Sequence, residues 1–145
     1  MNEAEEQALA ERVVRAMIVK DAFSQLLGME IVDVKPRAVV VRMTVRDDMV
    51  NGFGVCHGGV SFSLADSAFA FACNTHGRVT VSIENSITYP KRICVGDVLV
   101  ASAEEESASN KLGFYRVTVR RGDDVVGVFR GTAYKTEKPY FPNPE

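Results

Sequence analysis

The most constraining feature of this sequence is the run from Val60 to Cys73, in which apolar or small residues occupy almost every position. As a helix, this segment has no polar face, and such a helix is stable only where other parts of the chain cover it all round. The segments that follow it are rich in β-branched residues and predict strands. A sheet covers a helix on several sides by curling around it. The sequence therefore predicts an α+β fold, a central helix wrapped by a curved antiparallel sheet.

The other segments are consistent with one domain of this kind. The chain has 145 residues, of which 46% are hydrophobic, enough for a core without disulfides or structural metal. An amphipathic helix is expected over residues 2–27, with Gly28 at its end. Its apolar face is predicted to hold Leu9, Val13, Met17, Phe23 and Leu26. The predicted strands are Met29–Val34, Val39–Val45, Val79–Tyr89, Val98–Ser107, Leu112–Arg120 and Val125–Lys135. We expect a single domain over residues 1–138 and a loose tail over residues 139–145.

Composition excludes several classes of protein. A formal net charge of −2 gives no basic field for nucleic acid, so no such partner is expected. The three cysteines form no CxxC pair, which favours free thiols in a reducing cytoplasm. With only two histidines, His57 and His76, and no clustered carboxylates, no metal or other cofactor is expected. No segment is apolar and long enough to cross a bilayer, and the first residues are acidic, so we expect a cytoplasmic protein without a membrane partner.

Asp66 is the one side chain inside the apolar helix that is charged at neutral pH in water. Burying a charge is costly unless partners compensate for it. One interpretation is a structural aspartate that is hydrogen-bonded to Ser63, Ser67 or Ser82. The other is a general base or nucleophile with a perturbed pKa. Taken alone, the residue does not separate the two interpretations.

The loop before the helix favours the catalytic interpretation. Residues 51–59 are dense in glycine, and His57-Gly58-Gly59 offers no Ser, Thr, Asp or Asn as N-cap. The first backbone N–H groups of the helix would then lack a side-chain acceptor. Such groups form an anion or oxyanion site, although glycine in a loop more often serves only a positive φ. A bare helix start together with a buried carboxylate favours catalysis.

At this level of detail the motifs resemble a known family. The loop Asn51-Gly-x-Gly-x-Cys-His57-Gly58-Gly59, the helix Phe62–Asn74 and the strand Val81–Tyr89 are similar to those of the hotdog-fold acyl-CoA thioesterases, in the phenylacetate-pathway (PaaI-like) branch. The similarity extends over residues 22–135. It implies hydrolysis of an aryl- or medium-size acyl-CoA, such as phenylacetyl-CoA or hydroxyphenylacetyl-CoA, to the free acid and CoA.

The resemblance also implies roles for individual residues. Gly58 N–H and the Asn51 side chain would bind the developing oxyanion, and Asp66 would attack the thioester directly or activate water. Either Ser67 or Ser82 would orient that water, and His57 would steady the loop or the leaving group. The residues implied to contact CoA are Gly59, Tyr89, Arg92, Ser109, Asn110 and Lys111.

Two alternatives remain open at this stage. A hydratase or dehydratase of the same fold would use a histidine and a carboxylate to move protons, and His57 and Asp66 supply those residue types. A non-catalytic acyl-CoA sensor would bind the ligand without turnover. Incubation with acyl-CoAs distinguishes them, since only a thioesterase releases free thiol.

The spacing within the helix predicts an oligomer. Gly58 and Asp66 are eight residues apart, or about 12 Å along a helix axis, too far for one thioester to touch both. A two-fold dimer with antiparallel central helices would bring Gly58 of one subunit to Asp66 of the other. The small residues Ala65 and Ala68 would permit that approach, and burial under the sheet also explains them. The resemblance further implies a dimer of dimers.

Overall fold

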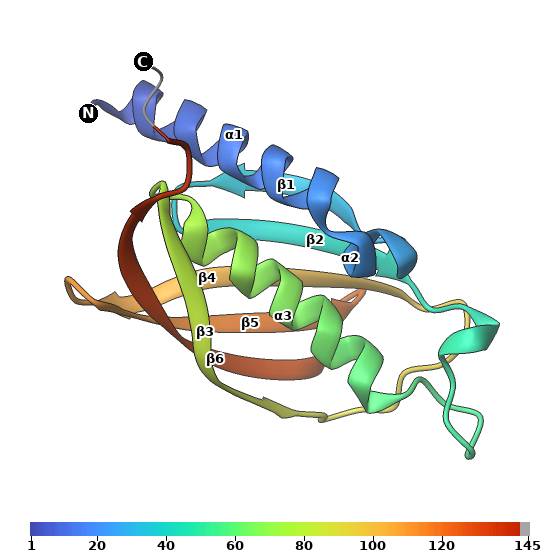
Figure 1. The fold of residues 1–145 in the computed structure, drawn as a ribbon. Helices are drawn as coiled ribbons and strands as arrows, with labels where there is room; N and C mark the ends of the chain where they lie inside the picture. Colours follow the sequence, from blue (N-terminus) through green and yellow to red (C-terminus); the bar gives the residue numbers. More distant parts are fainter. Residues whose placement is uncertain (143–145) are drawn as a thin grey trace.

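The protein is a single six-stranded antiparallel sheet curved around one long helix (Figure 1), in a computed structural model that describes residues 1–142. The strand order is β1-β2-β4-β5-β6-β3. The strands are β1 (Glu30–Lys35), β2 (Ala38–Thr44), β3 (Arg78–Thr88), β4 (Val98–Ala108), β5 (Leu112–Arg121) and β6 (Asp124–Pro139). The helices are α1 (Glu3–Lys20), α2 (Ala22–Leu26), a 3-10 turn η1 (Asp47–Met49) and α3 (Gly58–Asn74). The predicted α+β architecture is confirmed.

Helix α3 lies on the concave face of the sheet, and its apolar side chains form the centre of the core. Leu64, Phe69 and Phe71 are fully buried, and the Phe69 ring packs 5.7 Å from that of Phe129 on β6. Gly131 of β6 makes room for this packing, because a Cβ there would lie 2.7 Å from the Phe69 ring. The absence of a side chain at this point lets the sheet approach the helix closely.

One stripe of α3 is not covered by the chain, so the expectation of burial all round is wrong. Its members are only half-buried or exposed and follow the helical period: Gly59, Phe62, Ser63, Asp66 and Ala70. Ala65 and Ala68, by contrast, are fully buried beneath the sheet of the same subunit. Burial within the chain therefore explains why these two positions are alanine. The small residues of the uncovered stripe are Gly59, Ser63 and Ala70.

The open edge of the sheet is β3. Within residues 1–142 it pairs only with β6, and the other edge strand, β1, lies beside α1 (Figure 1). Val81 and Ile83 of β3 are about half exposed, at 47% and 57%. An edge strand with unpaired backbone groups and exposed apolar side chains is suited to pair with another strand.

The N-terminal segment is two helices, where the sequence predicted one. Asp21 has a ψ of 83°, outside the helical region, and its side chain caps α2. This single non-helical residue rotates the following turn. Ser24 and Leu27 face the core as a result, and Phe23 and Leu26, predicted on the buried face, are exposed. Helical periodicity predicts which residues share a face only while the helix is continuous. The prediction of the buried face therefore failed beyond residue 21, where the helix is interrupted.

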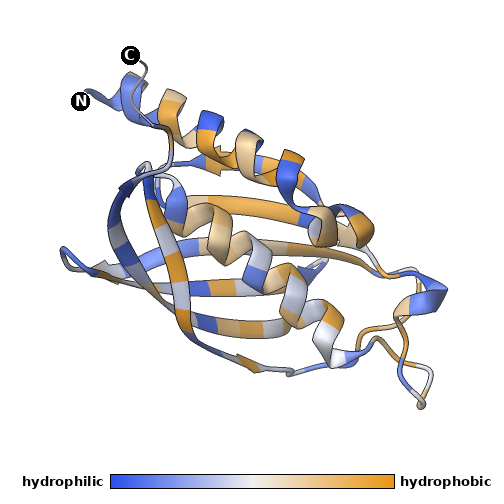
Figure 2. Cartoon of the chain, in the orientation of Figure 1, coloured by the Kyte–Doolittle hydropathy of each residue, from blue (hydrophilic) through white to orange (hydrophobic). Residues whose placement is uncertain are grey.

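Hydropathy along the chain follows these positions. Figure 2 shows β2 almost wholly hydrophobic and α1 with both hydrophobic and hydrophilic turns. Within residues 1–142, no helix combines the length and the apolar character needed to cross a membrane.

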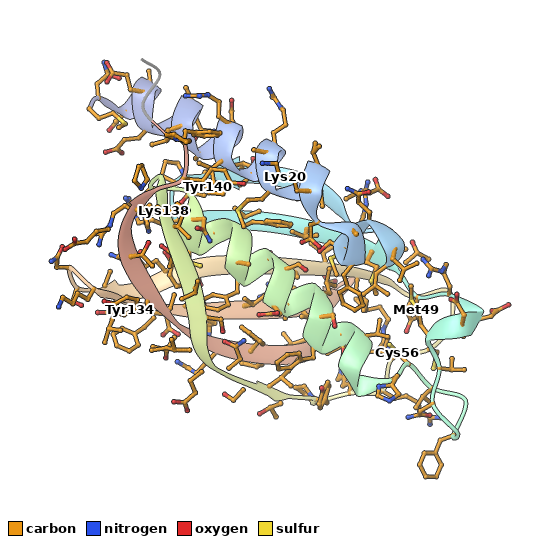
Figure 3. All side chains as sticks on the ribbon, in the orientation of Figure 1. Lys20, Met49, Cys56, Tyr134, Lys138 and Tyr140 are labelled. Carbon is orange, nitrogen blue, oxygen red and sulfur yellow. The ribbon has the colours of Figure 1, made fainter. Side chains whose placement is uncertain are left out.

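The C-terminal strand is longer than predicted and leads into a segment that contacts α1. Strand β6 continues to Pro139, and the Tyr140 N–H donates to the Gly77 carbonyl over 2.7 Å. Figure 3 shows Tyr140 beside α1, where the Arg12 guanidinium lies 4.4 Å from the Phe141 ring centre. Residues 143–145 of the predicted tail lie outside the described residues. The division into a domain and a tail at residue 138 stays a prediction.

Candidate active site

The loop that leads into α3 is anchored to η1 and to the segment between β3 and β4. The Cys56 N–H donates to the Ile93 carbonyl and the His57 N–H to the Met49 carbonyl, each over 2.8 Å. Figure 3 shows Cys56 at the base of this loop, close to where α3 begins. The Cys56 side chain is buried, and burial raises the pKa of its thiol. Cys56 is therefore a packing residue that anchors the loop.

His57 is the N-cap of α3, and this corrects the prediction of a helix start without a cap. Its Nδ1 accepts the Gly59 N–H over 2.9 Å. In a neutral imidazole one nitrogen accepts and the other carries the proton, so Nε2 is the donor here. Histidine is an uncommon N-cap, which is why residue type did not indicate it. The His57 side chain thus caps the first turn of α3, and the catalytic role that the resemblance implies for it stays a prediction.

Gly58 keeps a free backbone donor. Among the described residues its N–H forms no hydrogen bond, since the cap is used by Gly59. The Tyr89 hydroxyl donates to the Gly58 carbonyl over 2.8 Å. Tyr89, expected to contact CoA, therefore also pins the helix start. A free N–H in the first turn of a helix is suited to bind an anion.

Asn51 closes the glycine loop on itself. Its Oδ1 accepts the Phe53 N–H over 2.9 Å and the Val55 N–H over 3.4 Å. The carbonyl group of the amide is thus used, while its NH₂ donates to no group in residues 1–142. Asn51 is consequently a side-chain donor at the same end of α3 as Gly58.

Asp66 is held by a residue that the sequence did not indicate. The Asn85 Nδ2 donates to Asp66 Oδ1 over 3.1 Å, and the Ser82 hydroxyl donates to Asn85 Oδ1 over 2.9 Å. Ser82 thus reaches Asp66 through Asn85. Strand β3 has a bulge between Ser82 and Glu84, which places positions 82 and 85 on one face. Strict alternation would put them on opposite faces, so the pattern alone could not pair them.

The predicted serine partners of Asp66 do not contact it. The described hydrogen bonds include none from Ser63, Ser67 or Ser82 to its carboxylate. Ser63 donates to the Gly59 carbonyl over 2.7 Å, and the Ser67 hydroxyl lies 2.8 Å from that of Ser24 on α2. The structural interpretation, in which these serines satisfy the carboxylate, is therefore wrong. Oδ2 of Asp66 has no described partner.

The surroundings of Asp66 change its affinity for a proton. Desolvation by burial raises the pKa of this carboxyl, the Asn85 hydrogen bond lowers it, and the negative charge of Asp21 raises it. The net effect is a pKa above the ordinary aspartate value. A carboxylate with a raised pKa is a stronger base than one in water, which suits general-base work.

A pocket opens beside Gly58. Its volume is about 290 Å³, and its lining includes Gly58, Tyr89, Lys91 and Arg92. The Lys91 ammonium is paired with Asp124 over 2.7 Å. Arg92 forms no side-chain hydrogen bond or ion pair within residues 1–142. Arg92 is therefore the cation of this pocket that is free to bind an anionic ligand.

The structure does not bring the other predicted CoA contacts to this pocket. Residues 109–111 form the β4–β5 turn, where the Asn110 carbonyl accepts from Arg78 at the start of β3. That turn lies at the end of α3 away from Gly58 (Figure 1). Within one chain, Lys111 and Arg92 cannot bind the same small group.

The second histidine takes no part in this site. His76 follows the C-terminal end of α3, and burial together with Lys135 and Arg78 lowers its pKa to about 4. Its Nδ1 accepts the Arg78 N–H. Within residues 1–142, no three His, Cys, Asp or Glu side chains are grouped to hold a metal ion. The expectation that the protein needs no cofactor stays a prediction.

The candidate site therefore has two halves on one helix, a backbone N–H at Gly58 with no acceptor among residues 1–142 and a half-buried carboxylate with a raised pKa at Asp66. Residues 53–128 match the sequence profile described as "Thioesterase superfamily". The chain belongs to the thioesterase superfamily. It is accordingly an enzyme of the thioester hydrolase class.

Individual relatives agree with this assignment. The chain is 37% identical to the acyl-coenzyme A thioesterase PaaI of Escherichia coli, with 83% of this chain and 86% of the relative covered. It is 32% identical to human acyl-coenzyme A thioesterase 13 over 77% of this chain and 81% of the relative. The solved structure of E. coli PaaI superposes with a TM-score of 0.89, at 34% identity, over 92% of this chain and 97% of its own. The fold is thus the hotdog fold of that protein, and the resemblance to the PaaI-like branch is confirmed.

A structure with a bound ligand also matches. A Streptococcus mutans protein bound to acetyl CoA superposes with a TM-score of 0.73, at 26% identity, over 77% of this chain and 90% of its own.

We expect Asp66→Asn to raise the thermal unfolding midpoint. The substitution removes a half-buried charge, while an amide oxygen at position 66 still accepts from Asn85. An aspartate whose folded pKa is raised stabilises the fold only while it is protonated, and this contribution is lost as pH rises through its folded pKa. The variant should therefore match the wild type near pH 4 and exceed it increasingly towards pH 7. Calorimetry across this range measures the difference, and a variant less stable at pH 7 would contradict the cost assigned to Asp66.

Proposed function

We propose that this protein hydrolyses acyl-CoA thioesters to the free acid and CoA, with aryl- or medium-size acyl groups of the phenylacetyl or hydroxyphenylacetyl type. The observation that carries the proposal is Asp66, a half-buried carboxylate with a raised pKa, fixed through Oδ1 by Asn85 and free at Oδ2. The similarity to the E. coli and human acyl-coenzyme A thioesterases supports the acyl-CoA substrate class. E. coli PaaI comes from the phenylacetic acid degradation operon, and this origin supports the aryl acyl group.

In the proposed mechanism, the thioester carbonyl oxygen binds at the start of α3. The Gly58 N–H and the Asn51 amide, both without acceptors within residues 1–142, donate to that oxygen. Negative charge develops there as the tetrahedral intermediate forms, and donors already fixed in place stabilise it without reorganisation. The helix dipole adds to this effect. His57 holds the loop in the required shape by capping Gly59.

Asp66 supplies the other half of the reaction. Its free Oδ2 either takes a proton from water, which attacks the carbonyl carbon, or attacks that carbon itself to form an anhydride that water then hydrolyses. In both routes the C–S bond breaks, and its electron pair leaves with the CoA sulfur. Asn85 orients the carboxylate, so only one oxygen is presented to the substrate.

The CoA nucleotide is assigned to the pocket beside Gly58. Arg92 is free to bind a phosphate there, while Gly59 and Tyr89 border the same helix start. Arginine binds phosphate oxygens through a planar, permanently charged group. The turn at Ser109, Asn110 and Lys111 can contribute to the same nucleotide only from another subunit. The acetyl CoA complex of the S. mutans protein supports CoA as a ligand of this fold.

Each site is proposed to be shared between two subunits. Gly58 and Asp66 lie on one helix about 12 Å apart along its axis, so a single thioester cannot reach both within a chain. The uncovered stripe of α3 carries Asp66, and the neighbouring β3 edge exposes Val81 and Ile83. Pairing of two β3 edges around a two-fold axis would cover both features and set two α3 helices antiparallel. Assembly of two such dimers into a tetramer is also proposed.

The function is tested by following thiol release from phenylacetyl-CoA, crotonyl-CoA and a long-chain acyl-CoA. We expect thiol from the phenylacetyl ester, and a fall in kcat of about a hundredfold or more in Asp66→Asn with KM little changed. Cys56→Ser is the matched control and should retain most of the activity. Loss of the enoyl absorbance of crotonyl-CoA without thiol would indicate a hydratase, and saturable binding without turnover would indicate a sensor.

The phosphate role of Arg92 is tested by comparing two substrates. Arg92→Ala should raise KM for a CoA ester and weaken its dependence on salt, because a cation that contacts phosphate is removed. The N-acetylcysteamine thioester of the same acid lacks the nucleotide and should be hydrolysed as by the wild type. Lys91→Ala is the control, since Lys91 is already paired with Asp124. Equal losses on both substrates would indicate damage to the fold instead.

Sharing of the site is tested by subunit mixing. Gly58→Pro removes the donor at a position where proline fits a helix start, and Asp66→Asn removes the base, so each homodimer should be nearly inactive. Refolding the two together should make half the dimers mixed, each with one intact and one doubly altered site. Activity should then return to roughly a quarter of the wild-type level per site. A mixture that stays inactive, with exchange verified by mass spectrometry and folding by circular dichroism, would show that the site is not shared.

A further inference from the structure

A buried chain of hydrogen bonds joins α2 to the helix residue next to Asp66. The Asp21 carboxylate accepts twice from Ser24, over 2.9 Å from the backbone N–H to Oδ1 and over 2.6 Å from the hydroxyl to Oδ2. The Ser24 hydroxyl lies 2.8 Å from that of Ser67 on α3. Ser24 is 1% exposed and Ser67 9%. Capping of α2 requires only the bond to the Ser24 N–H, so the other two bonds have no role in the cap.

The single proton of each hydroxyl fixes the direction of this chain. An ionised carboxylate only accepts hydrogen bonds, and a serine hydroxyl has one proton to donate. The short contact to Asp21 is typical of a hydroxyl that donates to a carboxylate. The Ser24 hydroxyl therefore donates its hydrogen bond to Asp21. Ser67 must then be the donor in the bond between the two serines. The Ser67 proton is directed towards α2, and only its lone pairs are available to any other group.

A group that only accepts hydrogen bonds is suited to orient a water molecule that attacks the thioester. A water molecule presents a lone pair to the carbonyl carbon when both of its protons are held by acceptors. Oδ2 of Asp66 is one acceptor, because Asn85 occupies Oδ1. A serine that already donates its own proton elsewhere can be the second, and Ser67 is the next residue in the helix. A hydroxyl that donated to the water would instead turn the attacking lone pair away.

We propose that Asp21 and Ser24 are positioning residues for hydrolysis, which hold Ser67 as an acceptor for the attacking water beside Asp66. The inference rests on the proposed function, in the route where Asp66 activates water. In that step the water oxygen bonds to the carbonyl carbon and one proton passes to Asp66 Oδ2. The C–S bond breaks, and the sulfur leaves with the electron pair and takes up that proton. Ser67 keeps its own proton throughout.

The charge of Asp21 acts on the same site in a second way. It is the one charged side chain among those that shift the pKa of Asp66, and it raises that pKa from the side of α2. Asn85 on β3 is neutral, and burial raises the pKa of the nearby Cys73 thiol to about 12. Asp21→Asn keeps an acceptor for the helix cap, since asparagine is an equally good N-cap. The substitution removes the negative charge and weakens the hydrogen bond that the Ser24 hydroxyl donates to residue 21.

The decisive experiment is a double-mutant cycle between Ser24 and Ser67. Ser24→Ala should lower kcat about tenfold and leave KM within about twofold, because the freed Ser67 proton can be donated to the water or to Asp66. Ser67→Ala should lower kcat similarly. In the Ser67→Ala background, Ser24→Ala should cause no further loss, because Ser24 acts only through Ser67. Multiplicative losses would overturn the proposal.

The pH profile provides a readout that a structural role of Asp21 would not move. Asp21→Asn should shift the acid limb of kcat/KM to lower pH, since removal of the negative charge lowers the pKa of Asp66. Asn2→Ala is the matched control: Asn2 caps α1 in the same way, over 2.8 Å to the Glu5 N–H, but does not reach the site. It should leave kcat and the profile unchanged. Unfolding midpoints are measured for every variant, and activity is assayed well below the lowest of them.

The outcomes separate this inference from the function on which it rests. Inactive Asp66→Asn with a fully active Ser24→Ala, or with an unshifted profile in Asp21→Asn, would overturn the positioning role alone. Active Asp66→Asn would overturn the base itself and the positioning role with it.

Discussion

The need to cover helix α3 determines the arrangement of the rest of the molecule. Its apolar faces are buried by the concave side of a six-stranded sheet, and the approach is close enough that Phe69 leaves no room for a side chain at Gly131. A sheet must curl to achieve this coverage. The six strands of one chain do not surround α3 completely, and the part of the helix that they cover ends at the edge strand β3. The uncovered stripe that results is where Asp66 lies.

The surroundings of Asp66 follow from that incomplete coverage. A carboxylate deep in the core would be too costly to keep charged, and one on an open surface would have an ordinary pKa. On the stripe, Asp66 is desolvated enough for its pKa to rise, yet one of its oxygens remains free. Asn85 and Asp21 then act on it in opposite directions, from β3 and from the start of α2. Departure from the usual rules of burial at one residue is typical of functional sites.

The sequence was sufficient to find the residues whose signal is local. Asp66 interrupts an apolar helix, and Gly58 stands at the start of that helix within a glycine-rich loop, so both are visible from their immediate neighbours. Asn85 and Ser24 are not. Asn85 lies 19 residues from Asp66, and Ser24 lies 43 residues from Ser67. Their roles depend on a β-bulge and on a helix break at Asp21 that the hydrophobic pattern does not reveal.

What the sequence by itself determined was the fold class, the six strands and their order along the chain, the central position of α3 and the candidate residues Gly58 and Asp66. These follow from periodicity and from steric preferences that act over a few residues. Only the tertiary structure decided which donors remain free within residues 1–142, which hydroxyl lies beside that of Ser67 and which stripe of α3 stays open. Hydrogen bonds form or fail over a few tenths of an ångström. The distance between two elements is set by the packing of the whole core, to which residues far apart in the chain all contribute.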